Sequence, residues 1–380
     1  MFRYILMGGF IFFIMTAAVA QPAKTATEFY RDGLNLKKEQ KYKDALKAFK
    51  AAIQKKPEYA DALYEAGACC NKLEQYKDGL AYLQKVKKIK SPTSKIYFET
   101  AYAFDNLGET DDAILNYKKT IELNPQYYSA YKSLGDIYYD LKDYEHASEN
   151  FTEYLDGDEY PDNEYYYKAG WCLNELGKYE DALEYLEQYV PDTADDNAKK
   201  YVETGYANYA LKKNDEAIAA YNKAIAYKAD YGRAFRELGD VYYENTKEYD
   251  KAIQYYELAI QNDEENSKEC LYKLGWCYND KNEYGKAASI LEKAILYKPD
   301  ASSNREELAY AYYMEEKYDI ALIQLQKAVL LDSKSTLGYY YMGLCYLARD
   351  RKDDALDAYE KLKPLNSDLS EQLLKKINGE

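Results

Sequence analysis

Two tryptophan–asparagine pairs are the most distinctive chemical groups in this sequence. Trp171 precedes Asn174 and Trp276 precedes Asn279, and both pairs stand in the same pattern, Tyr-x-x-Gly-Trp-Cys-x-Asn. Aromatic rings bring a large contact area at low entropic cost and carry an N–H or O–H that orients a ligand. An asparagine amide can meet both the donor and the acceptor of an extended peptide backbone. These residue types therefore suit recognition of an extended peptide, and equally the stacking of sugar rings.

Few residues in the chain could act in catalysis or bind a metal. His146 is the single histidine, which rules out a proton relay between histidines or a multi-histidine metal site. We find no phosphate-binding loop, no nucleophile elbow and no metal-type cysteine spacing. The acidic loops lack the full calcium-loop pattern. We therefore expect no enzymatic activity, no cofactor and no metal, and we expect the six cysteines to be buried free thiols.

Charge and composition narrow the classes of partner. The 66 acidic residues outnumber the 51 basic ones, giving a net charge of −15. Nucleic acids and anionic membrane surfaces are therefore disfavoured as ligands, and basic proteins or peptides are favoured. The 47% of hydrophobic residues can bury a core, while only 18 glycines and 8 prolines are present. This balance predicts an ordered, all-helical protein.

A repeat of 34 or 35 residues accounts for the helices that must position these groups. A small residue, usually alanine, recurs at this interval: Ala45, Gly79, Ala113, Ala147, Ala182, Ala217, Ala252, Ala287, Ala321 and Ala355. Another small residue, glycine in eight of the ten units, lies 12 or 13 residues before each of them. Each unit holds two amphipathic stretches whose apolar residues follow helical spacing. One helix pair cannot bury its own apolar face, so the pairs must stack into a solenoid.

This pattern resembles the tetratricopeptide repeat family. The resemblance implies an all-α, right-handed solenoid of ten repeats, which we number 1 to 10. Their expected starts are residues 26, 60, 94, 128, 163, 198, 232, 268, 302 and 336. The predicted organisation is a signal peptide (1–20), a short lead (21–25), the repeats (26–366) and a C-terminal capping helix (367–380).

A longer period is superimposed on the repeats. Repeats 2, 5 and 8 share a motif that ends in an asparagine, at Asn71, Asn174 and Asn279, so a cassette of three repeats recurs after 103 to 105 residues. Duplication of a three-repeat ancestor explains this period by itself. It also places the same surface chemistry at regular intervals along the solenoid.

The resemblance also implies which residues line the concave side, because the first helix of each tetratricopeptide pair faces it. The predicted ligand-binding residues are Tyr64, Tyr102, Tyr139, Tyr167, Trp171, Asn174, Tyr206, Tyr209, Tyr243, Tyr272, Trp276, Asn279, Tyr310 and Tyr313. Packing between neighbouring repeats is the alternative for any one of the tyrosines. Two charged pairs on the same helices have the i,i+4 spacing at which the two residues of a pair can form an ion pair with each other. They are Lys132/Asp136 and Arg236/Asp240.

The first twenty residues have the pattern of a signal for export. Arg3 precedes an apolar run from Ile5 to Met15, and a small-residue cleavage site ends at Ala20. This arrangement is typical of a secretory signal, with an uncleaved anchor as the alternative. We expect a periplasmic or cell-surface protein with no membrane insertion after cleavage.

The sequence as a whole predicts a non-enzymatic scaffold or adaptor that captures an extended peptide or a helix in an aromatic groove. Two alternatives use the same features. The groove could bind a cell-wall or capsule glycan by ring stacking, or the solenoid could self-assemble into homo-oligomers.

Overall fold

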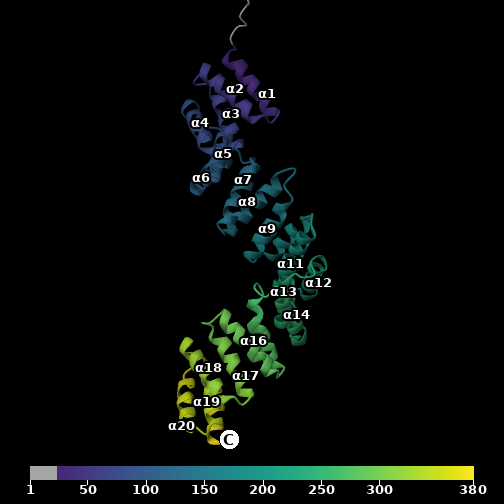
Figure 1. The fold of residues 1–380 in the computed structure, drawn as a ribbon, viewed down its shortest axis with the longest axis vertical. Coiled ribbons are helices and arrows are strands. Elements are labelled where there is room, and N and C mark those ends of the chain that lie inside the picture. Colours follow the sequence, from purple (N-terminus) through teal and green to yellow (C-terminus); the bar gives the residue numbers. More distant parts are fainter. Residues whose placement is uncertain (1–23) are drawn as a thin grey trace, which may run out of the picture. The chain divides into compact units, whose positions relative to one another are not determined.

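The computed structural model of the protein describes residues 24–380. The predicted signal peptide and most of the predicted lead lie outside the described residues. Every regular element between residues 24 and 380 is a helix, as Figure 1 shows. The all-helical prediction is therefore confirmed. None of these helices combines the length and apolarity needed to cross a membrane.

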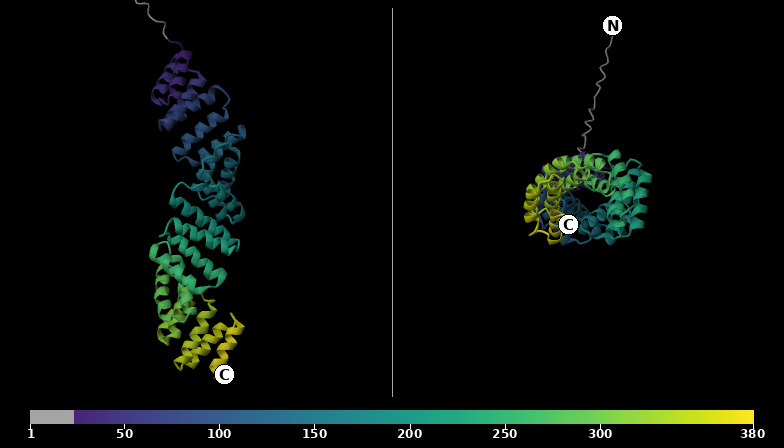
Figure 2. Two further views of the ribbon diagram at one scale, coloured as in Figure 1. Left: turned by 90° about the vertical axis from the view of Figure 1, so that its right-hand side faces the viewer. Right: turned by 90° about the horizontal axis from the view of Figure 1, so that it is seen from below.

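The helices come in consecutive antiparallel pairs. The first helices are α1 (Ala26–Lys38), α3 (Ala60–Lys72), α5 (Ser94–Asn106), α7 (Tyr128–Asp140), α9 (Glu164–Glu175), α11 (Ala194–Ala210), α13 (Gly232–Asp240), α15 (Leu271–Asp280), α17 (Ser302–Met314) and α19 (Thr336–Ala348). The second helices are α2 (Tyr42–Lys55), α4 (Tyr76–Ile89), α6 (Thr110–Leu123), α8 (Tyr144–Gly157), α10 (Tyr179–Gln188), α12 (Asn214–Tyr227), α14 (Tyr249–Asn262), α16 (Tyr284–Tyr297), α18 (Tyr318–Leu331) and α20 (Lys352–Leu362). A last helix, α21 (Ser367–Asn378), follows them. Within each of the two units described below, successive pairs stack on one another, as Figure 2 shows.

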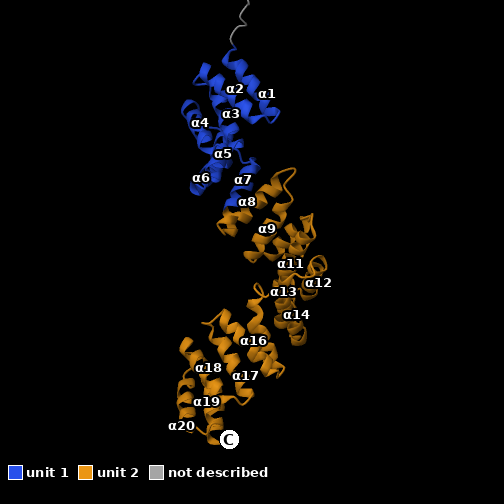
Figure 3. Ribbon diagram, in the orientation of Figure 1, with its two compact units in different colours: residues 1–137 blue, residues 138–380 orange. Residues whose placement is uncertain are grey.

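The chain divides into two compact units, which are coloured separately in Figure 3. Unit 1 ends at Ile137 and unit 2 runs from Tyr138 to Glu380, so the boundary falls within α7. Each unit is described by itself below.

Close contact between the two helices of a pair explains the small residue in each first helix. A Cβ atom added to Gly275 would lie 2.5 Å from Leu291 Cγ, and one added to Gly205 would lie 2.6 Å from the Tyr221 ring. Leu291 and Tyr221 are fully buried. The glycines let the large residue of the second helix pack directly against the first helix.

The first helices lie closer together than the second helices. α9 contacts α11 and α15 contacts α17 in unit 2, and α3 contacts α5 in unit 1. Within either unit, no comparable contact joins the second helices of neighbouring repeats among the described residues. The first helices therefore line the inner side of each curved stack. We call the side chains that they expose there the inner surface.

Repeat 7 departs from the common helix geometry. Gly239 precedes Ala252 by 13 residues, whereas the corresponding spacing in the other repeats is 12. The extra residue is absorbed by a π-helical turn, η1 (Val241–Thr246), which continues α13. Single-residue insertions commonly produce such turns, often at functional sites. In repeat 8 a short 3₁₀ turn, η2 (Lys268–Cys270), leads into α15.

All ten turns between paired helices contain one residue in the left-handed region. These residues are Gln40, Glu74, Gly108, Lys142, Gly177, Lys212, Lys247, Asn282, Glu316 and Asp350, with φ between +55° and +74°. Only two of the ten are glycine, although glycine is the residue that adopts this conformation without strain. The other eight turns therefore hold a strained residue.

Replacing Glu316 with glycine should relieve this strain. Glu316 has φ of +60° and is exposed. We expect Glu316→Gly to raise the free energy of unfolding by about 0.5–1 kcal/mol, measured by urea denaturation. The matched control is Gly177→Ala, because Gly177 has φ of +73° and only distant neighbours. The free energy of unfolding of Gly177→Ala should fall by a similar amount. An unchanged stability in both variants would contradict the strain argument.

Helix α21 covers the end of the last pair. Leu373 and Ile377 are buried and pack in one cluster with Leu344, Cys345 and Leu362. Asn366 caps the helix by accepting a hydrogen bond from the backbone N–H of Leu369. The opposite face of α21 carries charged residues, as a terminal cap needs in order to keep the solenoid end soluble.

Candidate functional site

The fourteen predicted ligand-binding residues all belong to first helices or, for Tyr243, to η1. Their twelve aromatic side chains are half-buried, so each ring packs on one side and meets solvent on the other. Asn174 and Asn279 differ from them, with only 1% and 3% of their surface exposed. The aromatic part of the predicted surface is thus available for contact.

Each tryptophan packs against two tyrosines of the preceding repeat. The Trp171 ring centroid lies 5.3 Å from that of Tyr139 and 4.9 Å from that of Tyr144. The arrangement recurs in repeats 7 and 8, where Trp276 lies 5.4 Å from Tyr243 and 5.1 Å from Tyr249. Most of these pairs meet edge-on or tilted, which is the favourable geometry for aromatic rings. The tryptophans therefore join repeats and still present part of the ring to solvent.

Three other inner-surface tyrosines make one shared contact. Tyr102, Tyr206 and Tyr310 each lie 6.0–6.3 Å, edge to face, from the first tyrosine of the preceding second helix. Packing between repeats is therefore part of the role of these side chains. The rest of each ring lines the inner surface.

The asparagines link neighbouring repeats. Asn279 Nδ2 donates to the Glu307 backbone oxygen at 3.0 Å and to Glu307 Oε2 at 2.9 Å. Asn174 makes the same two bonds to Glu203, at 3.1 and 3.2 Å, and Asn71 binds Glu99 in this way. The amide nitrogens of these asparagines therefore link neighbouring repeats, whereas their Oδ1 atoms have no hydrogen-bond partner among the described residues. The sequence-based prediction that Asn174 and Asn279 contact a ligand stays a prediction.

The pairing expected within one helix for Arg236 and Asp240 is wrong. Arg236 binds Glu237 at 2.8 Å and Glu269 at 3.2 Å. Asp240 Oδ1 accepts from Lys273 Nζ at 2.8 Å. Both side chains reach the following repeat because repeats stack closely enough for long polar side chains to bridge them.

A polar network surrounds the π-helical turn of repeat 7. Lys273 Nζ also donates to Glu244 Oε1 at 2.7 Å, and the Tyr209 hydroxyl donates to the same carboxylate. The Tyr256 hydroxyl donates to Asp240 Oδ1 at 2.6 Å. Burial raises the pKa of Asp240, and the Lys273 ammonium partly offsets that shift. The network anchors the Tyr209 hydroxyl to repeat 7.

Beside this network, Arg233 neutralises a buried acid. Arg233 Nη1 lies 2.7 Å from Glu203 Oε1, and only 1% of the Glu203 side chain is exposed. Neighbouring Glu203 and Glu237 carboxylates raise the pKa of Arg233 against the opposing effect of its own burial. The ion pair joins α13 to α11.

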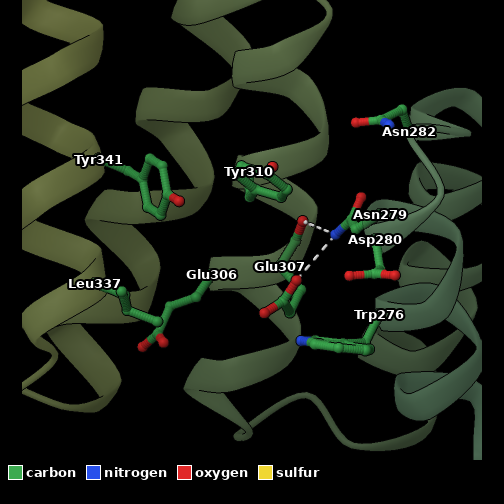
Figure 4. A pocket seen from close by; sticks show the side chains of 9 residues that line it. All are labelled: Trp276, Asn279, Asp280, Asn282, Glu306, Glu307, Tyr310, Leu337 and Tyr341. Carbon is green, nitrogen blue, oxygen red and sulfur yellow. Dashed lines mark hydrogen bonds between the residues drawn. The ribbon is translucent and has the colours of Figure 1, made fainter. Parts of the chain in front are cut away.

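Three pockets open on the inner surface within single units. The largest, of about 700 Å³, lies in repeats 4–6 and includes Tyr139, Tyr167 and Lys168. A pocket of about 270 Å³ in repeats 8–10 includes Trp276, Tyr310 and Tyr341, and is drawn in Figure 4. A pocket in unit 1 has the corresponding place in repeats 2–4.

The acidic residues and Tyr341 that line the repeat 8–10 pocket were not predicted from the sequence. Glu307 and Tyr341 occupy positions that the family resemblance does not assign to the groove. The signal that could have found them is the three-repeat period, because Glu99, Glu203 and Glu307 follow one another at intervals of 104 residues.

The cysteines and the histidine have structural surroundings. All six cysteines are buried and unpaired. Burial raises the pKa of the Cys172 and Cys277 thiols to about 12, so they are not activated nucleophiles. His146 lies at the start of α8, stacked on Tyr138, with Nδ1 2.8 Å from Asp143. Among residues 24–380 no group of three potential metal ligands is present.

Comparison with known proteins agrees with the helix-pair architecture. Models of the tetratricopeptide repeat match residues 36–95, 101–142, 143–198, 202–267, 268–300 and 306–369. The matches cover most of the described chain and leave no long segment outside the repeats.

Individual relatives are distant. A TPR repeat-containing protein of Methanocaldococcus jannaschii is 26% identical over 318 residues, covering 75% of this chain and 54% of that protein. The Hsp70-Hsp90 organizing protein of Triticum aestivum is 25% identical over 230 residues, covering 60% of this chain and 34% of that protein. The chain thus spans about half or less of the length of these relatives.

Solved structures with similar helices include YrrB, described as a TPR protein with an unusual peptide-binding site. It is 21% identical and has a TM-score of 0.46, with 52% of this chain and 97% of that chain covered. Yeast Tom70 is 18% identical with a TM-score of 0.36, over 93% of this chain and 95% of that chain. From the family matches and the ten helix pairs, we conclude that this chain belongs to the tetratricopeptide repeat family.

Proposed function

We propose that the protein is a non-enzymatic scaffold or adaptor that binds extended or helical peptide segments on its inner surface. Tetratricopeptide repeats generally mediate protein–protein interactions, and relatives of this chain bear names of assembly and organising proteins. The observation that carries the proposal is the row of half-buried aromatic rings along the first helices. Such rings are enriched where proteins bind one another, since they add contact area with little entropy loss.

The charge of the chain supports a preference for basic partners. A net charge of −15 draws positively charged segments toward the protein and accelerates their encounter with it. The apolar, small-residue pattern at the start of the sequence supports export to the cell envelope, where the partner would be met.

The two tryptophans allow a direct test, because they are the only ones in the chain and both lie on the inner surface. Peptides from an immobilised library are first selected with the full chain and then titrated while tryptophan fluorescence is recorded. We expect binding to change the emission of the wild-type chain. Variants without tryptophan are titrated into the same peptides carrying a dye, with fluorescence anisotropy as the readout. Trp171→Ala/Trp276→Ala should then lose at least tenfold in peptide affinity, as for central aromatic contacts.

Two control variants separate contact from folding. Trp171→Phe/Trp276→Phe keeps the packing against the tyrosines and should lose less affinity than the alanine variant. Tyr160→Ala/Leu330→Ala removes side chains that are 81% and 84% exposed and should bind as the wild type does. Fluorescence changes with soluble cell-wall glycans but with no peptide would replace the proposal by the glycan alternative. Concentration-dependent light scattering without either ligand would favour self-assembly.

A further inference from the structure

The pocket in repeats 8–10 combines acidic groups with aromatic walls. Asp280, Glu306 and Glu307 line it together with Trp276, Asn279, Asn282, Tyr310, Leu337 and Tyr341. In Figure 4 the Glu307 side chain lies between the Trp276 and Tyr310 rings, and the Glu306 carboxylate lies beside Leu337. No lysine or arginine is among the lining residues. The pocket is therefore negative, partly apolar and open to solvent.

Its carboxylates lack a positive partner. Among residues 24–380, no ion pair engages Asp280, Glu306 or Glu307. Glu307 accepts from Asn279, and Glu306 Oε1 accepts from Ser335 Oγ at 2.8 Å. Burial raises the pKa of Glu307, the hydrogen bond from Asn279 partly offsets this shift, and the Glu306 charge adds to it. A carboxylate in this state gains more from a cation than an exposed one does.

The same chain contains a filled version of this site. In repeats 5–7, Asn174 binds Glu203 as Asn279 binds Glu307. Arg233 supplies the cation there, with Nη1 2.7 Å from Glu203 Oε1. Leu337 stands at the position equivalent to Arg233, 104 residues later, just as Glu307 follows Glu203 by 104 residues. The guanidinium that completes the site in repeats 5–7 is thus missing in repeats 8–10.

We infer that the pocket in repeats 8–10 binds the arginine side chain of a partner peptide. The guanidinium takes the place that Arg233 fills in repeats 5–7 and pairs with Glu307. Its planar face stacks on the aromatic walls, and Leu337 packs against its methylene stem. The inference rests on the proposed peptide-binding function and names one chemical feature of the ligand.

The corresponding pocket in unit 1 does not share this preference. Lys72 and Lys132 line it beside Glu99, and a nearby Lys72 lowers the pKa of Glu99 against the effect of burial. Positive charge is already present there. The arginine site is therefore confined to repeats 8–10.

The test uses the full chain with Trp171→Phe, so that Trp276 alone reports. The probes are acetyl-Gly-Gly-Arg-Gly-Gly-amide and the same peptide with citrulline, which is neutral but has a closely similar shape. We expect the arginine peptide to change Trp276 emission, with an affinity that falls as salt rises. The citrulline peptide should bind at least tenfold more weakly.

Two variants address the pocket from opposite sides. Glu307→Gln keeps an oxygen for Asn279 and removes the charge, so it should fold and lose at least tenfold in arginine-peptide affinity. Leu337→Arg supplies the internal guanidinium found in repeats 5–7 and should block the pocket to a similar degree. Glu216→Gln, an exposed site on α12, makes the same charge change elsewhere and should leave binding unaltered. Thermal unfolding of each variant confirms that it is folded.

The inference fails if the arginine peptide does not bind, if citrulline binds equally well, or if both pocket variants bind normally. Its failure is distinguishable from that of the proposed function. Library peptides that bind through Trp171 and Trp276 without a need for arginine would overturn the arginine site alone. Glycan binding with no peptide binding would overturn both.

Discussion

Replacing Arg233 with methionine should lower the free energy of unfolding of the chain by about 2–3 kcal/mol. The substitution leaves Glu203, which is 1% exposed, without its 2.7 Å partner. Breaking a buried ion pair on one side costs about 3–5 kcal/mol. We expect the lower figure because the Arg233 side chain is itself 34% exposed, so water already screens part of its attraction to Glu203.

A second substitution should recover most of the lost free energy of unfolding. Glu203→Gln added to Arg233→Met removes the stranded charge, and its amide oxygen can still accept from Asn174 Nδ2. Urea denaturation of both single variants and the double variant gives the coupling energy. Arg349→Met is the matched control, because its 3.2 Å pair with Asp319 is exposed on both sides and should be worth less than about 0.5 kcal/mol. Equal losses for Arg233→Met and Arg349→Met would show that Glu203 does not depend on its partner.

The helices and their pairing were predictable from the sequence because they depend on local spacing. The small residue that faces Leu291 or Tyr221 has to recur once per pair, and the packing leaves little room for anything larger. Eleven of the twelve predicted aromatic residues lie on the first helices, and Tyr243 lies on the π-helical turn that continues α13. The helical period decides which face of a helix each residue occupies. Their degree of burial was not predictable, because it depends on the preceding repeat.

Side chains that bridge repeats escaped the sequence analysis. An asparagine at position 279 could bind a peptide backbone or a neighbouring helix. Its residue type and its place in the sequence motif fit both roles equally. In the structure the amide nitrogen of Asn279 binds Glu307, which lies 28 residues further along the chain and is brought into contact only by stacking. The Arg236 and Asp240 pairing was wrong for the same reason, because better partners arrive from the next repeat.

A simple rule of stacking connects these cases. A residue in the last turn of one first helix contacts a residue in the second turn of the next first helix, as Lys37 does with Glu65 at 2.6 Å. Asn71 with Glu99 and Asn279 with Glu307 follow the same geometry. Glu203 also pairs with a cation from its own chain, Arg233, so its carboxylate is already neutralised. Glu307 has no such cation among residues 24–380, so its carboxylate remains on the inner surface as a hydrogen-bond acceptor for an outside ligand.

We expect the C-terminal end of the solenoid to be as sensitive to substitution as the buried ion pair of Arg233 and Glu203. We expect Leu373→Asp to detach α21 from the last repeat, because Leu373 is fully buried against α19 and a carboxylate there would lack a partner. A helix of 12 residues is only marginally stable without its packing surface. The detached segment should therefore lose its helical structure, seen as fast amide hydrogen exchange over residues 367–378.

Loss of α21 uncovers the apolar surface formed by Leu344, Cys345 and Leu362, and exposed ends of solenoids associate. Light scattering should then show oligomers whose size grows with protein concentration. Gln372→Asp introduces the same charge at the neighbouring exposed position and should leave both exchange and mass unchanged. Slow exchange and a constant mass in Leu373→Asp would mean that α21 is not what limits association at this end. A wild-type chain that already forms the same oligomers would instead locate self-assembly elsewhere, since its cap is closed.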